Sequence, residues 1–301
     1  MRVVFLGTPE FAVPALDALA REHEVALVVA QPDKPAGRGM HMHAPAVAVR
    51  AKALGLPLAQ PAKIREAAAL DAIRAARPDV GIVVAYGKIL PNALLEIPRH
   101  GFINIHASLL PRYRGAAPIQ RAIEHGEAET GVTIMRVDEE LDHGARLAVA
   151  KTAIDPDEHT PSLAARLSAL GAEALLPVLE ALANGTAVDT PQEHAVATYA
   201  SKIEKQEGHI DWSASARSIY DKYRAFDPWP GVFTDTLKLN EIAPATGSGQ
   251  PGTILTVDES GVTVAAGEDA IRLITVQRPG KSRISAFELA RTVGWRAGMP
   301  L

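Results

Sequence analysis

The chain has 301 residues, of which 47% are apolar and 22% are charged, and its formal net charge at pH 7 is -4. This length exceeds what a single hydrophobic core usually serves, so we expect two domains. The acidic balance provides no global basic field for nucleic-acid binding, and the absence of cysteine excludes disulfides, thiolate metal sites and a cysteine nucleophile.

The first half of the chain alternates segments typical of strands and of helices. Residues 2–7 predict a buried strand, after which Thr8 and Pro9 suit the start of a helix that runs to about Leu19. Further strands are predicted at residues 24–30, 56–58, 80–85, 132–137 and 146–153, with one more ending at His106. Further helices are predicted near residues 46–54, 64–74, 91–95, 117–125 and 162–183. This order predicts a Rossmann-like, mostly parallel sheet with helices on both faces.

The second half has a different pattern. Residues 190–207 are polar and lack a clear period, so we predict a catalytic domain at 1–189, a linker at 190–208 and a C-terminal domain at 209–301. A helix is predicted from Asp211 to about Phe226. Short strands are predicted at residues 232–239, 252–257, 262–265 and 271–276. Strands of this length and spacing indicate a small, OB-like β-barrel.

Asn104 and His106 are the first candidates for chemistry. They are two residues apart on a predicted strand, so both side chains point to the same face at the strand's carboxyl end, where open parallel sheets bind ligands. An amide donor beside an imidazole could stabilise a carbonyl oxygen that gains negative charge during acyl transfer to an amine. The pair alone is equally compatible with a polar strand end satisfied by local backbone.

Asp142 is a third candidate, in an acidic loop after a later strand. A carboxylate near His106 would favour the imidazolium and help to accept the proton of an attacking amine. Without that proximity, Asp142 would be one more carboxylate on a surface turn.

The segment 32–45 is long and carries Lys34 and Arg38, together with His41 and His43. Its composition is typical of a surface connection. Two histidines without a cysteine partner are weak support for a metal site, so we expect no metal. The chain also lacks a G-x-G-x-x-G loop and a G-x-x-x-x-G-K-[ST] loop, which argues against NAD and ATP.

Several segments together carry a family resemblance. They are Asn104-x-His106-x-Ser108-Leu109-Leu110-Pro111, the stretches 112–120 and 131–135, Asp142-x-Gly144, the segments 5–12, 31–39 and 84–91, and the later 210–212 and 226–230. In these segments the chain resembles the folate-dependent formyltransferases, almost continuously through the first domain. One departure is Ala107, where the family often has glycine.

The resemblance implies transfer of a formyl group from 10-formyltetrahydrofolate to the α-amine of the methionine on initiator methionyl-tRNA, for translation initiation. It implies Asn104, His106 and Asp142 as the catalytic residues. The implied folate-site residues are Ser108, Leu109, Leu110, Pro111, Ala85, Tyr86, Gly87 and Leu90. The resemblance also implies that the loop with Lys34 and Arg38 enters the acceptor arm of the tRNA.

The C-terminal domain has no excess of basic residues, because ten Lys and Arg balance ten Asp and Glu from residue 209 to the end. A tRNA surface there would have to come from clustering, for which Arg278, Lys281 and Arg283 are the best candidates. A solvated turn is the equally good alternative for this cluster.

Two other functions remain open on the sequence. One is a formyltransferase that acts on a small amine, either a purine precursor or an amino sugar nucleotide; the long loop and the C-terminal extension favour tRNA instead. The other is a non-catalytic RNA-binding protein, which the intact Asn104, His106 and Asp142 disfavour. The N-terminal run is too short for a signal peptide and we find no stretch of roughly 20 apolar residues, so we expect a soluble, cytoplasmic monomer without membrane contact.

Overall fold

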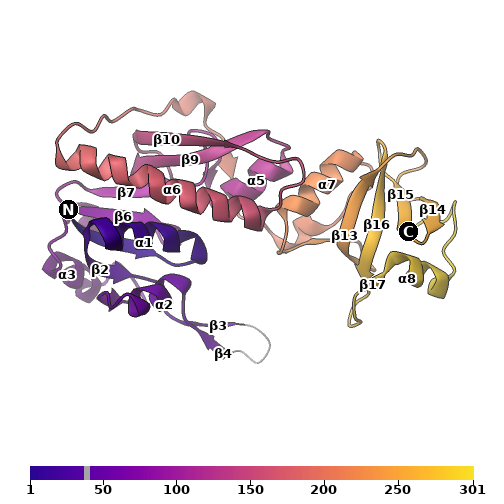
Figure 1. Cartoon of the computed structure of the whole chain (residues 1–301), viewed down its shortest axis with the longest axis horizontal. Helices are drawn as coiled ribbons and strands as arrows, with labels where there is room; N and C mark the ends of the chain where they lie inside the picture. The colour runs from indigo at the N-terminus through magenta and orange to yellow at the C-terminus, as the bar shows by residue number, and fades with distance from the viewer. Residues whose placement is uncertain (37–40) are drawn as a thin grey trace. The chain divides into compact units, whose positions relative to one another are not determined.

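The computed structural model describes residues 1–36 and 41–301 and divides the chain into two compact units (Figure 1). The first unit comprises Met1–Pro118, Glu129–Ala153 and Ala164–Ala200. The second comprises Ile119–Ala128, Ile154–Leu163 and Ser201–Leu301.

The first unit contains a seven-stranded sheet of order β10-β9-β7-β6-β1-β2-β5. The strands are β1 (Arg2–Gly7), β2 (Glu24–Val29), β5 (Leu58–Ala59), β6 (Val80–Val84), β7 (Phe102–His106), β9 (Glu129–Arg136) and β10 (Arg146–Ala153). The five from β5 to β7 run parallel, whereas β9 and β10 are antiparallel to their neighbours. The predicted mostly parallel sheet is therefore confirmed, and the carboxyl ends of its parallel strands share one edge.

Helices cover both faces of this sheet. The face with Ile103 and Ile105 packs against α1 (Val13–Glu22), which follows the short helix η1 (Glu10–Ala12), and against α2 (Ala46–Ala53) and α6 (Thr160–Ala183). The opposite face, which includes Phe102, packs against α3 (Ala67–Ala75) and α4 (Asn92–Leu95). The alternation along β7 explains the arrangement, because successive side chains of a strand point to opposite faces.

α6 is long and apolar enough to cross a membrane by length and composition alone. The sequence prediction that no such stretch exists is therefore wrong by this measure. It is weak support for a membrane span, because Leu175, Leu179 and Leu182 of this helix are buried in the core of the first unit. A core helix that packs on a sheet needs the same apolar composition.

Two small pairs of strands complete the first unit. β3 (Lys34–Ala36) and β4 (His41–His43) form an antiparallel pair within the segment predicted as a long connection. β8 (Arg114–Gly115) pairs in parallel with β11 (Tyr199–Ala200). The predicted linker thus contains a strand and the short helices η2 (His194–Val196) and η3 (Lys205–Gly208).

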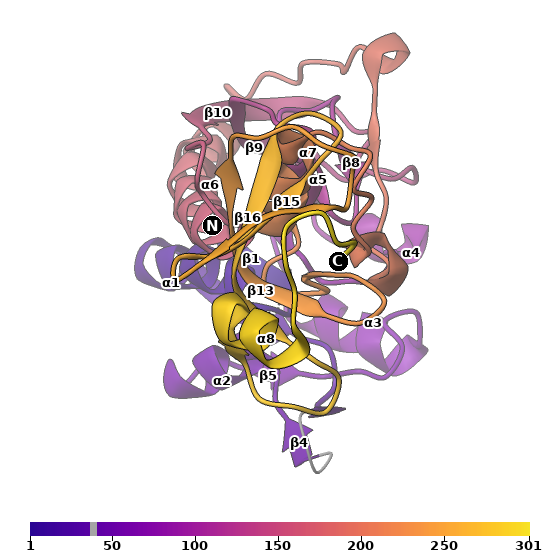
Figure 2. The same ribbon diagram turned by 90° about the vertical axis from the view of Figure 1, so that its right-hand side faces the viewer.

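The second unit is built on an antiparallel sheet of order β12-β13-β16-β15-β14, with β17 added to β16 (Figure 2). The strands are β12 (Val232–Phe233), β13 (Lys238–Ala245), β14 (Ile254–Asp258), β15 (Gly261–Ala265), β16 (Ala270–Gln277) and β17 (Ile284–Ser285). The helices are α7 (Ala216–Ala225), α8 (Ala286–Val293) and most of α5 (Pro118–Glu124). The predicted change from a parallel α/β sheet to a C-terminal set of antiparallel strands is confirmed.

Two predicted boundaries in this unit are wrong. The single strand predicted at 232–239 is interrupted by a turn, in which the Thr234 hydroxyl accepts from the backbone of Leu237 at 3.2 Å. The helix predicted from Asp211 begins at Ala216, because the Asp211 carboxylate accepts from the backbone of Ser213 at 2.9 Å and closes a turn of its own.

Candidate active site

Asn104 and His106 lie at the carboxyl end of β7, on the same face as Phe102. Asn104 pairs with Val83 of β6 and with Met135 of β9, so the strand that carries both residues is held on both sides. Asn104 is half-buried and His106 is 5% exposed. The sheet therefore presents an amide and an imidazole at the edge where parallel strands bind ligands.

His106 faces an oxygen on each of its two ring nitrogens. Its Nε2 lies 2.9 Å from the backbone oxygen of Tyr113, and its Nδ1 lies 3.6 Å from Oδ1 of Asp142. A carbonyl oxygen only accepts, so Nε2 carries a proton. The other nitrogen, Nδ1, faces the carboxylate, so the fold brings Asp142 to His106.

Asp142 has a backbone conformation that residues with a Cβ rarely adopt, with φ of 50°. Such a conformation costs on the order of 1–3 kcal/mol and needs support from its surroundings. Gly115 donates its backbone N–H to Oδ2 of Asp142 at 2.8 Å. The side chain of Gln192 donates to the backbone oxygens of Asp142 at 2.9 Å and of Gly144 at 2.8 Å.

Gly144 is required for the same loop, because a Cβ there would lie 2.1 Å from the backbone oxygen of Arg136. The sequence reasoning did not identify Gln192. A single glutamine in a polar stretch carries no local signal, and only its burial to 5% exposure marks it.

The predicted folate residues Ser108 to Pro111 form a loop that is anchored to its surroundings. The Ser108 hydroxyl donates to the backbone oxygen of Arg112 at 2.6 Å. Thr133 of β9 donates to the backbone oxygen of Ser108 at 2.7 Å and accepts from the backbone of Leu110 at 3.1 Å. Leu110 is buried, whereas Leu109 and Pro111 are half-buried.

The other predicted folate residues follow β6. Ala85 and Gly87 both have positive φ, of 47° and 80°, and the space where a Cβ of Gly87 would lie is open. Tyr86 and Leu90 are buried. Burial raises the pKa of the Tyr86 hydroxyl.

This segment is connected to the loop of Asp142. Asn92 donates from its side chain to Glu139 at 2.6 Å. The exposed side chains of Ile89, at 87%, and Leu141, at 61%, belong to these two connected segments.

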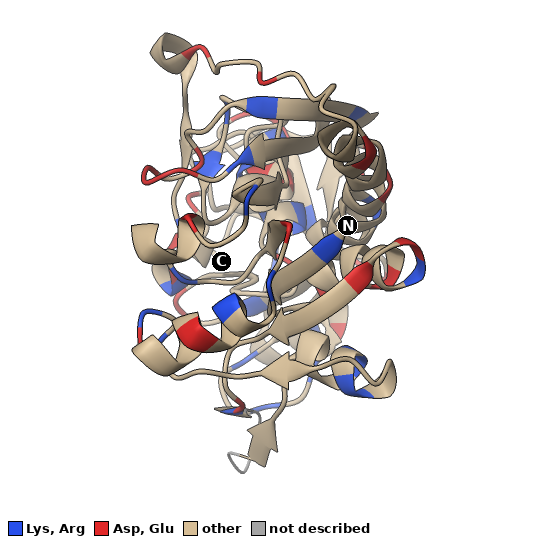
Figure 3. Cartoon of the chain, turned by 90° about the vertical axis from the view of Figure 1, so that its left-hand side faces the viewer, with Lys and Arg blue, Asp and Glu red and all other residues tan. Residues whose placement is uncertain are grey.

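The predicted tRNA contacts belong to separate parts of the chain. Lys34 is exposed on β3, in the first unit, and Arg38 lies outside the described residues. Arg278, Lys281 and Arg283 are exposed in the turn between β16 and β17, in the second unit. In the view of Figure 3, basic and acidic residues are interspersed along the ribbon.

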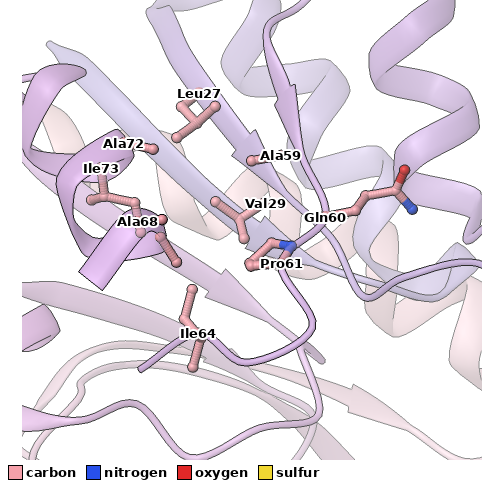
Figure 4. Close-up of a pocket in the computed structure, with 10 residues that line it drawn as sticks. Leu27, Val29, Ala59, Gln60, Pro61, Ile64, Ala68, Ala72 and Ile73 are labelled. Atoms are coloured by element: carbon pink, nitrogen blue, oxygen red, sulfur yellow. The ribbon is translucent and has the colours of Figure 1, made fainter. Parts of the chain in front are cut away.

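A pocket of about 280 Å³ lies between α3 and the strands β2 and β5 (Figure 4). It is lined mainly by apolar residues, among them Leu27, Val29 and Ala72, and contains none of the predicted site residues. Within residues 1–36 and 41–301, no group of three or more His, Asp or Glu side chains could hold a metal ion.

Comparison with known proteins identifies the family. Residues 1–179 match the family model described as formyl transferase, and residues 202–294 match that of the formyl transferase C-terminal domain. The chain belongs to the formyl transferase family, as the sequence motifs predicted.

Two similar curated proteins match nearly the whole chain and share one name. Over 305 residues the chain is 48% identical to a methionyl-tRNA formyltransferase of Thermus thermophilus, covering 100% of this chain and 99% of that protein. It is 47% identical to the methionyl-tRNA formyltransferase of Aromatoleum aromaticum, covering 99% of this chain and 96% of that protein.

Solved structures share the fold at lower identity. An N-formyltransferase from Helicobacter canadensis, in complex with folinic acid and dTDP-3-aminofucose, matches with a TM-score of 0.70 and 16% identity over 91% of this chain and 98% of that one. HypX from Aquifex aeolicus, in complex with tetrahydrofolic acid, matches with a TM-score of 0.63 and 20% identity over 98% of this chain and 47% of that one.

Proposed function

We propose that this chain transfers a formyl group from 10-formyltetrahydrofolate to the free amino group of methionine on initiator methionyl-tRNA, for translation initiation. The observation that carries this proposal is the identity of 48% over the full length to a methionyl-tRNA formyltransferase. The geometry supports it as well, because Asp142 lies 3.6 Å from His106 at the sheet edge that also carries Asn104.

In the proposed mechanism, the amine attacks the formyl carbon, and Asn104 and His106 stabilise the negative charge that develops on the formyl oxygen. The bond between the formyl carbon and the folate nitrogen would then break, and tetrahydrofolate would leave with a proton on that nitrogen. Asp142, 3.6 Å from Nδ1 of His106, orients the ring and takes part in removing the proton of the amine. Nε2 of His106 already donates to the Tyr113 backbone oxygen, so a hydrogen bond from Nε2 to the substrate must compete with that contact. The Asn104 amide is half-buried at the end of the strand.

The formyl donor would be held by the two loops beside these residues. The donor supplies a formyl group activated for transfer, and the chain supplies apolar surface and backbone polar groups. Ser108, Leu109, Leu110 and Pro111 would line the folate site on one side, and Ala85, Tyr86, Gly87 and Leu90 would border the pterin on the other. The open space at Gly87 and the exposed Ile89 fit a flat, partly apolar group.

The tRNA would be bound by Lys34 and Arg38 of the segment 32–45 and by Arg278, Lys281 and Arg283. We assign catalysis to residues 1–189, the connection to 190–208 and tRNA binding to 209–301. We also propose a cytoplasmic monomer. A small amine acceptor is not favoured, because the structures with sugar ligands resemble this chain at 16% identity, which supports the fold alone.

The decisive experiment compares three acceptors with 10-formyltetrahydrofolate as donor. Charged initiator methionine tRNA is expected to be formylated much faster than charged elongator methionine tRNA and a free small amine. Formylation of the free amine alone would refute the proposed substrate.

A further inference from the structure

One buried side chain holds the loop that carries Asp142. Gln192 uses both hydrogens of its Nε2 group on the backbone oxygens of Asp142 and Gly144, at 2.9 and 2.8 Å. The first of these oxygens belongs to Asp142 itself, the residue with the positive φ. Hydrogen bonds from the surrounding structure stabilise a backbone with this uncommon conformation.

The orientation of the Gln192 amide is itself fixed by Arg114, which is 3% exposed. Arg114 donates to Oε1 of Gln192 from Nε at 3.2 Å and from Nη2 at 2.8 Å. A guanidinium only donates and a backbone oxygen only accepts. A flipped amide would place donor against donor and acceptor against acceptor, so only one orientation satisfies all partners.

The same stretch of chain also supports the carboxylate of Asp142. Oδ2 accepts from the backbone of Gly115, while Oδ1 lies toward His106. Gly115 belongs to β8, which pairs with β11, and a Cβ on Gly115 would lie 2.7 Å from the backbone oxygen of Ala200. The start of the stretch is held by a pair of backbone hydrogen bonds between Thr190 and Arg146, at 2.8 and 2.9 Å.

Building on the formyl transfer proposed above, we propose that Gln192 is a positioning residue for Asp142. Gln192, which lies between the two segments matched by the family models, would then belong to the active site. Gln192 touches no reacting atom; it acts by fixing the carboxylate of Asp142 relative to His106. Loss of a supporting partner of this kind typically costs about 10- to 100-fold in rate.

The test uses Gln192→Glu in the full-length protein. Glutamate keeps the shape and an acceptor for Arg114, but it removes both donors and sets a carboxylate oxygen against two backbone oxygens. We expect kcat to fall about 10- to 100-fold while KM for each substrate stays within about twofold. Amide hydrogen exchange in residues 138–144 should become faster. Glu193→Gln, at the exposed neighbouring position, should leave kcat and exchange unchanged.

A second variant separates positioning from other roles. Because Gln192 acts through Asp142, the double variant Gln192→Glu with Asp142→Asn should be no slower than Asp142→Asn alone. A wild-type kcat for Gln192→Glu, or additive losses in the double variant, would overturn the assignment of Gln192 and leave the proposed function standing. Full activity of Asp142→Asn would overturn both. If Gln192→Glu does not fold, Gln192→Asn replaces it, because asparagine has the same amide on a shorter side chain. The same changes in kcat, KM and amide exchange are then expected.

Discussion

His106 is placed between two acceptors that differ in charge, the neutral backbone oxygen of Tyr113 and the carboxylate of Asp142. A neutral imidazole has one proton and satisfies only one of them. In this structure Nε2 donates to the Tyr113 backbone oxygen, and Nδ1 lies 3.6 Å from the carboxylate of Asp142. The ring of His106 is therefore oriented by fixed groups before a substrate binds, which reduces the reorganisation needed during the reaction.

Replacing Asn104 with alanine should remove one donor to the formyl oxygen. Loss of such a donor costs about 10²–10³-fold in kcat in other enzymes, and we expect this range without unfolding because Asn104 is only half-buried. Steady-state formylation kinetics and a thermal melt measure the two effects. Asn184→Ala, at an exposed turn, is the matched control. Near wild-type turnover in both Asn104→Ala and His106→Ala would contradict the assignment.

At the scale of residues, local patterns and long-range contacts differ in how far they can be predicted. Asn104 and His106 follow from spacing on one strand. The approach of Asp142 to His106 joins residues 36 positions apart. The contact of Gln192 with Asp142 spans 50 positions. No periodicity encodes such contacts, so Asp142 was suggested by the motif and Gln192 was missed.

At the scale of elements, the β3–β4 pair bounds the residues proposed to enter the acceptor arm. Arg38→Ala should weaken the use of charged tRNA, through a higher KM, because a cation near phosphate is lost. Binding of the folate donor should stay intact. Both can be measured by formylation kinetics and by direct folate titration, with Lys52→Ala on the exposed side of α2 as the control. An equal loss of tRNA use and folate binding would argue against this role.

The turn between β16 and β17 holds the basic cluster of the second unit. Replacing Arg278, Lys281 and Arg283 together with glutamate should weaken tRNA binding. Each lost phosphate contact should also reduce the slope of log K against log salt by about 0.7–0.9. Binding titrations at several salt concentrations measure both. Arg283→Glu and Arg296→Glu change the net charge equally, and both positions are exposed. A larger loss of tRNA affinity in Arg283→Glu would therefore indicate a local contact. Unchanged affinity and slope would remove the cluster from the interface.

Elements with a strong period were predicted well, and elements set by side-chain turns were not. The parallel strands and α6 follow from long apolar patterns. The break between β12 and β13 depends on the hydrogen bond that the Thr234 hydroxyl accepts from the backbone of Leu237. The late start of α7 depends on Asp211 and on Ser215, whose hydroxyl accepts from Ser218 at the helix N-terminus. The pairing of β11 with β8 was not predicted because two-residue strands have no measurable period.

At the scale of the whole molecule, the formal net charge is only -4, and individual ion pairs connect segments that are far apart in the sequence. Within the second unit, Arg121 of α5 contacts Glu207 of η3 at 2.8 Å. The hydrogen bond from Arg121 lowers the pKa of the Glu207 carboxyl below its usual value. This ion pair links residues that are 86 positions apart in the chain and belong to one compact unit.

The Arg121–Glu207 contact predicts a pH-dependent stability. Because the pKa of Glu207 is lower in the folded state, its contribution is present above the unfolded value of about 4.5 and is lost as the pH falls through the folded value. Glu207→Gln should lower the free energy of unfolding by less than about 1 kcal/mol at pH 7, as expected of a partly exposed pair. Denaturant titrations at pH 7 and at about pH 3 should show the difference disappearing. Glu259→Gln, at an exposed turn, should show no such pH dependence; a deficit in Glu207→Gln that persists at low pH would contradict the sign.

The contact between Gln192 and the loop of Asp142 also has a consequence for synthesis on the ribosome. Asp142 is made 50 residues before the glutamine that holds its backbone. At about 5–20 residues per second, the loop waits about 3–10 s for that side chain to be added, and longer for it to leave the exit tunnel. The backbone of Asp142 therefore receives this support only after α6 has been made, so catalytic competence arises late in translation.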